Sequence, residues 1–82
     1  MQRLPQTLVN VPGVDKRRAG TDGSLLEAVR AAEESLGETG RVLLRSSGTE
    51  DLVRVMVEAG SQAEADRVAH ELADVVQRRL AL

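Results

Sequence analysis

Two short apolar runs with a period of two residues, 41–45 and 52–58, flank a polar loop and constrain the fold more than any other feature. Side chains in a β-strand point alternately to two faces, so each run predicts a strand with one apolar face. In the second run, Val53, Val55 and Val57 share that face. We therefore expect an antiparallel hairpin that buries its valine face.

The register of this hairpin is predicted by matching its apolar faces. Placing Leu44 opposite Val53 brings the two apolar faces to the same side of the sheet. In that register Arg45 and Arg54 are diagonal neighbours on the other face, roughly 7–8 Å apart. Two guanidinium groups at that spacing are expected to grip one phosphate from two sides.

The loop between the two runs carries residue types that suit an anion. Ser47 and Thr49 offer hydroxyl donors, and Gly48 lets the backbone bend with its N–H groups turned toward a ligand. The arginines at either side supply permanent positive charge. Judged by residue types alone, an ordinary hairpin turn is an equally good interpretation. The candidate phosphate ligands are Arg45, Ser47, Gly48, Thr49 and Arg54.

A helix is predicted over residues 24–36, where the apolar residues recur at helical spacing. Ser24 and Glu27 have the spacing of a capping box, which predicts where this helix begins. Gly37 suits its C-terminal cap. This segment is therefore expected to pack one apolar stripe against the sheet.

A second helix is predicted after Gly60, where Ser61 and Glu64 repeat the capping-box spacing. His70 lies beside the apolar stripe of this helix, so an exposed position is expected for it rather than a role as a catalytic base. The stripe consists of Ala65, Val68, Ala69, Leu72, Val75, Val76 and Leu80.

Residues 6–11 predict a further short strand that stops at the turn pair Pro12-Gly13. The basic run 16–18 follows in a polar loop, and we interpret it as solvated and outside the site. The order is then strand, helix, strand, strand, helix. This order predicts one α+β domain over residues 1–82: a small antiparallel sheet with two helices packed on one face.

Composition excludes several classes of function. The formal net charge is −2, so no general attraction to nucleic acid or to an anionic membrane is expected. The chain has no cysteine, one histidine and no aromatic residue, which argues against a Cys- or His-based metal site and against base stacking. No apolar run has the length of a membrane span. A cytoplasmic monomer without a metal or cofactor of its own is therefore expected.

The run 41–50, Arg-Val-Leu-Leu-Arg-Ser-Ser-Gly-Thr-Glu, followed by Val-Arg-Val-Met-Val-Glu at 53–58, resembles the C-terminal domain of bacterial phosphoglucosamine mutases. These enzymes belong to the α-D-phosphohexomutase superfamily. The resemblance covers nearly all of the chain and implies a TATA-binding-protein-like fold. It also implies that the loop holds the phosphate that is not transferred. One departure is Asp51, which stands where the family usually has proline.

The implied reaction of the parent enzyme interconverts glucosamine 6-phosphate and glucosamine 1-phosphate, toward UDP-N-acetylglucosamine and the cell wall. The resemblance places the phosphoserine, the Mg²⁺-binding aspartates and the sugar-selecting loop in domains upstream of Met1. No catalytic residue or metal ligand is then expected in this chain, and the isolated domain is expected to be inactive. Its partners would be the hexosamine phosphate and those upstream domains.

Three other interpretations stay open. The domain could come from a phosphomannomutase or a phosphoglucomutase, because the residues that select the sugar lie elsewhere. It could be a free-standing phosphate-binding module that uses the same loop. It could also be a protein-interaction module that uses the face with Leu52 and Met56.

Overall fold

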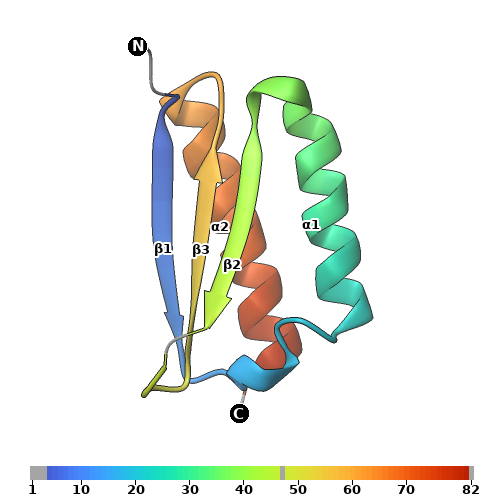
Figure 1. Ribbon diagram of the computed structural model, residues 1–82, viewed down its shortest axis with the longest axis vertical. Helices are drawn as coiled ribbons and strands as arrows, with labels where there is room; N and C mark the ends of the chain where they lie inside the picture. Colours follow the sequence, from blue (N-terminus) through green and yellow to red (C-terminus); the bar gives the residue numbers. More distant parts are fainter. Residues whose placement is uncertain (1–3, 47, 82) are drawn as a thin grey trace.

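The computed structural model describes residues 4–46 and 48–81, and these form a three-stranded antiparallel sheet with two helices on one side (Figure 1). The predicted α+β class and element order are confirmed. The elements are β1 (Gln6–Pro12), α1 (Gly23–Leu36), β2 (Arg41–Ser46), β3 (Leu52–Glu58) and α2 (Gln62–Leu80), with 3₁₀ turns at Lys16–Arg18 and Gly37–Thr39.

Strand β3 lies at the centre of the sheet, between β1 and β2. Its three valines are fully buried beneath the helices. Helix α2 lies against β1 and β3, while α1 covers β2 and packs beside α2 (Figure 1). The buried core consists of Val11, Val14, Leu25, Leu36, Val42, Val53, Val55, Val57, Ala59, Ala65, Val68, Ala69, Leu72, Val76 and Leu80.

The predicted hairpin register is wrong by two residues. Leu44 lies opposite Val55 rather than Val53, and Arg45 lies directly opposite Arg54. A shift of two residues keeps every side chain on its own face, so face matching alone does not distinguish the two registers. In the observed register the backbone carbonyl of Asp51, just before β3, accepts hydrogen bonds from the turn that follows β1.

The first residue of α1 also differs from the prediction. Asp22, not Ser24, is the N-cap, and its carboxylate accepts a hydrogen bond of 3.0 Å from the backbone N–H of Leu25. The capping-box pattern is wrong here because an equally good capping residue stands two positions earlier. The cap at the other end is confirmed, with Gly37 at a φ of 70° in the left-handed region that favours glycine.

Helix α2 begins as predicted. The hydroxyl of Ser61 accepts a hydrogen bond of 3.2 Å from the backbone N–H of Glu64. The predicted apolar stripe is buried except for Val75, which is half-buried beside α1. Among residues 4–46 and 48–81, no helix is long and apolar enough to cross a bilayer.

Candidate anion-binding site

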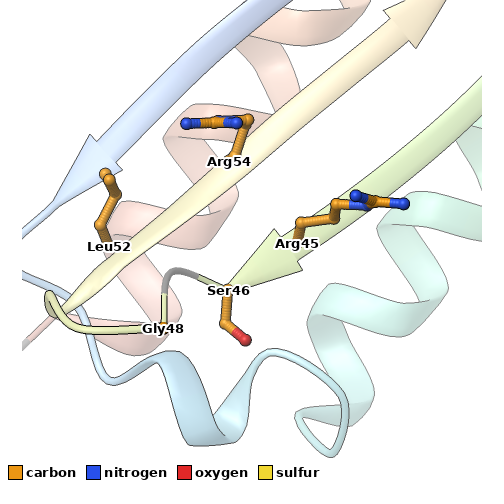
Figure 2. A pocket seen from close by; sticks show the side chains of 5 residues that line it. All are labelled: Arg45, Ser46, Gly48, Leu52 and Arg54. Atoms are coloured by element: carbon orange, nitrogen blue, oxygen red, sulfur yellow. The ribbon is translucent and has the colours of Figure 1, made fainter.

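A surface pocket of about 280 Å³ lies at the end of the sheet where β2 and β3 meet their connecting loop (Figure 2). Its position follows from the hairpin, since Arg45 and Arg54 come from the solvent-facing side of their strands, Ser46 comes from the exposed end of β2 opposite Val53, and the loop contributes backbone. The described residues that line it are Arg45, Ser46, Gly48, Leu52 and Arg54.

Arg45 and Arg54 face each other across the hairpin as register partners, and both are exposed. They are therefore closer than the diagonal arrangement that the sequence predicted. Their guanidinium groups point apart in Figure 2, with that of Arg54 directed toward β1 and that of Arg45 directed away from β3. The structure thus brings both arginines to one pocket without converging their charged ends on one point.

The positive charges of this pair have no carboxylate partner within the part of the chain that the structure describes. Like charges directly opposite on adjacent strands destabilise a sheet. A bound anion would remove that repulsion and accept hydrogen bonds from both groups. The electrostatics of the pocket therefore favour a small anion over a cation or a neutral ligand.

Asn10, which the sequence analysis missed, lies beside this site and contacts one of its arginines. It lies opposite Arg54 on β1, and its Oδ1 accepts a hydrogen bond of 3.2 Å from Arg54 Nε. The pairing of β1 with β3 was not predicted, so nothing connected residue 10 with residue 54. The three side chains form a line across the solvent-facing side of the sheet, the Asn10–Arg54–Arg45 row.

The loop residues named as ligands differ in what the structure shows of them. Gly48 lines the pocket, and Ser46, which was not predicted, lines it as well. Thr49 is exposed and lies outside the lining. Ser47 lies outside the described residues.

The exit of the loop is anchored to the turn after β1. The carbonyl of Asp51 accepts hydrogen bonds from the backbone N–H groups of Gly13 at 3.0 Å and Val14 at 3.4 Å. Gly13 has a φ of 71°, a backbone conformation that residues other than glycine rarely adopt. The exposed Asp51 side chain adds a negative charge to this end of the sheet. The loop is therefore held through its backbone at Asp51, while the Asp51 side chain faces solvent.

A second row of side chains, the apolar row of Leu8, Met56 and Leu43, lies next to the Asn10–Arg54–Arg45 row on the same face. It borders a further surface pocket of about 290 Å³ that both arginines also line. Leu8 is 55% exposed and Leu43 is 40% exposed. This face of the sheet thus combines a cationic strip with an uncovered apolar strip.

Metal chemistry has no support from the side chains that the structure describes. Across residues 4–46 and 48–81, no three histidine, aspartate or glutamate side chains come together as metal ligands. His70 is exposed, as predicted, and its Nδ1 lies 2.7 Å from the backbone oxygen of Asp66. It lies on α2, on the opposite side of the sheet from the pocket.

The comparisons with known proteins agree on one family. The family described as phosphoglucomutase/phosphomannomutase, C-terminal domain, matches residues 8–75. Proteins named phosphoglucosamine mutase from Kineococcus radiotolerans and Renibacterium salmoninarum are 70% and 62% identical over the whole chain. The chain covers 18% of the length of each of these relatives.

A solved structure agrees with the sequence relatives. The crystal structure of Aspergillus fumigatus N-acetylphosphoglucosamine mutase in complex with GlcNAc-6P and magnesium superposes with a TM-score of 0.82 at 31% identity. The match covers 98% of this chain and 16% of that one. The similarity therefore extends over the sheet, both helices and the loop.

Proposed function

The chain belongs to the phosphoglucomutase/phosphomannomutase family as its C-terminal domain, and from this premise we propose that it anchors the phosphate of a hexosamine phosphate that is not transferred. The observation that carries this proposal is the pair Arg45 and Arg54, directly opposite each other beside the pocket without a carboxylate partner among the described residues. A phosphate supplies the charge that this pair lacks.

The proposed ligands are the two arginines together with the loop. Arg54 and Arg45 both line the pocket, and the exposed guanidinium of Arg45 turns toward a shared phosphate by rotation of its side chain, a motion that takes picoseconds to nanoseconds. The hydroxyls of Ser47 and Thr49 and the backbone of Gly48 complete the proposed set. Fixing a flexible arginine costs side-chain entropy, so we expect the isolated domain to bind phosphate in the millimolar range or more weakly.

The parent reaction that we propose is the interconversion of glucosamine 6-phosphate and glucosamine 1-phosphate in the cytoplasm. The high identity to proteins named phosphoglucosamine mutase supports this choice over a phosphomannomutase or phosphoglucomutase parent. A fungal relative has been crystallised with GlcNAc-6P and magnesium. We propose that the phosphoserine and any Mg²⁺ site of the parent lie in other domains of it.

The contribution of this domain to catalysis would be positional. Holding one phosphate fixes the sugar so that its other end lies in line with the transferring group, which raises the effective concentration of the reacting atoms. No described side chain of the pocket is proposed as acid, base or nucleophile. The arginines would act through charge and hydrogen bonds to phosphate oxygens.

Steady-state kinetics of a full-length mutase that carries this domain test the proposal. Replacing Arg45 by alanine removes a charge-assisted contact and is expected to lower kcat/KM by about 10- to 100-fold. Arg41→Ala is the matched control, because Arg41 lies on the same strand and the same face but outside the pocket. An unchanged kcat/KM in the Arg45 variant would refute the anchoring role.

The apolar row favours a second candidate role, contact with another protein, such as a second copy of this chain. Leu8 and Leu43 are large apolar side chains that the described chain leaves exposed. Sedimentation of the wild-type chain and of Leu43→Lys tests this role. Self-association that the lysine removes would support it, and a monomer in both cases would leave phosphate anchoring as the better account.

A further inference from the structure

We propose that Asn10 is a positioning residue that orients Arg54 for end-on contact with a phosphate. This inference rests on the proposed function, because it names how one arginine of that site meets its ligand. Asn10 makes its contact through Arg54 and lies outside the residues that line the pocket.

The hydrogen bond defines which edge of the guanidinium stays available. Arg54 Nε donates to Asn10 Oδ1 at 3.2 Å. A guanidinium binds an oxyanion either side-on, through Nε and one Nη, or end-on, through both Nη atoms. With Nε occupied, the end-on edge is the one left for the ligand. Asn10 thereby selects one of the two bidentate geometries.

The contact between Asn10 and Arg54 is fixed by the pairing of β1 with β3. Asn10 and Arg54 are register partners on adjacent strands, so their side chains emerge from the same face side by side. Asn10 also lies on a strand that α2 holds at another point, where Gln62 Nε2 donates to the backbone oxygen of Gln6 at 3.2 Å. The acceptor is therefore mounted on rigid backbone rather than on the loop.

The neutral amide is the suitable acceptor at this position. An aspartate would also accept from Arg54, but its charge would neutralise the guanidinium and repel an incoming phosphate. An amide oxygen orients the group and leaves its charge for the ligand. Because arginine only donates, the amide must present its oxygen to Nε.

The two arginines then have different roles. The Arg54 side chain is held before the ligand arrives, whereas the side chain of Arg45 has no hydrogen-bond or ion-pair partner among residues 4–46 and 48–81. Figure 2 shows the two guanidinium groups pointing apart, in agreement with one tethered and one free side chain. A phosphate would meet Arg54 first and recruit Arg45 second.

The hydrogen bond from Arg54 Nε to Asn10, called the tether below, is tested without ligand. The measurement is hydrogen exchange at arginine Nε–H groups in the ¹⁵N-labelled 82-residue chain. The Nε–H of Arg54 is expected to exchange about two- to tenfold more slowly than that of Arg45. Asn10→Ala should remove this slowing of exchange at Arg54, called protection below, and Asn10→Asp should keep it. Gln6→Ala, on the same strand and face but opposite Glu58, is the control and should leave it unchanged.

The consequence for binding is tested by titrating the same variants with inorganic phosphate. Asn10→Ala and Asn10→Asp are expected to raise the Kd about three- to tenfold, the first by loss of orientation and the second by charge. Gln6→Ala should bind like the wild type. In an Arg54→Lys background, which lacks the Nε–H, Asn10→Ala should cause no further loss.

The exchange measurement and the phosphate titration test separate claims. Loss of protection in Asn10→Ala without any change in Kd, or tighter phosphate binding by that variant, would overturn the positioning role. Equal exchange at Arg45 and Arg54 in the wild type would overturn the tether itself. A wild-type chain that shows the tether but gives no response to phosphate would overturn the proposed function, and the positioning role with it. Dispersed amide spectra of each variant establish that it is folded.

Discussion

Asp22 shows what a single side chain does for this small domain. It is only 8% exposed, and it accepts hydrogen bonds from the Leu25 N–H at the start of α1 and from Arg79 near the end of α2 at 3.2 and 3.3 Å. Arg18 adds an ion pair at 3.4 Å. Residues 57 positions apart in sequence are thus joined at one carboxylate, which local spacing does not reveal.

The pH dependence of stability follows from this contact. The Arg79 hydrogen bond and the Leu25 N–H hold the pKa of Asp22 below its ordinary value of 3.8. A lowered pKa contributes stability above the unfolded-state value, and that contribution is lost as the pH falls through the folded-state value. Asp22→Asn should therefore be less stable than wild type at neutral pH, with a gap that narrows below pH 3.8.

Urea unfolding of both proteins over this pH range measures the gap. Asp66, whose pKa is also lowered, mainly by the hydroxyl of Thr7, is present in both proteins and so cancels in the comparison. A gap that is constant with pH would contradict the assignment.

Gly40 is a second residue whose role is set by its surroundings. A Cβ added there would overlap the Cβ of Leu36, a buried core residue. Gly40→Ala is therefore expected to destabilise the fold by about 1–3 kcal/mol. Gly20→Ala is the control, because nothing lies within 4 Å of its added Cβ. Equal midpoints of thermal unfolding for the two variants would be inconsistent with the close approach of Gly40 to Leu36.

At the level of secondary structure, the sequence predicted each helix and strand because the periods of two and 3.6 residues are distinct in it. It did not predict the hairpin register, since shifts of two residues preserve every face. It placed Arg45 and Arg54 on one face correctly, but made them diagonal rather than opposite. The predicted start of α1 was wrong for a related reason. Asp22 and Ser24 both satisfy the local pattern, and the long-range contact with Arg79, which favours Asp22, is not visible in it.

The two helix starts give a matched test of capping. Ser61→Ala removes the side-chain cap of α2 and should cost about 1 kcal/mol of unfolding free energy. Ser24→Ala leaves the Asp22 cap of α1 intact and should change stability by less than about 0.5 kcal/mol. Chemical denaturation of both variants measures the difference. A larger loss for Ser24→Ala would mean that the capping box predicted from the sequence is formed after all.

Over the whole molecule, the two faces of the sheet have different roles, one in the core and one at the surface. The valine face of β3 is buried beneath α1 and α2 and supplies the core, while the other face carries the Asn10–Arg54–Arg45 row and the apolar row. The sequence predicted this division, because alternation along β3 separates valines from Arg54 and Met56. It did not predict Asn10, because β1 reaches β3 only through the tertiary fold.

The central claim, that this face binds phosphate through its paired arginines, is tested most directly by amide NMR titration of the chain with inorganic phosphate and glucosamine 6-phosphate. Shifts concentrated at residues 45–54 are expected with both ligands and not with glucosamine. They should be lost in Arg45→Ala and Arg54→Ala and kept in Arg41→Ala, which removes the same charge outside the pocket. Equal weakening by all three variants, or no shift in that segment, would contradict the account.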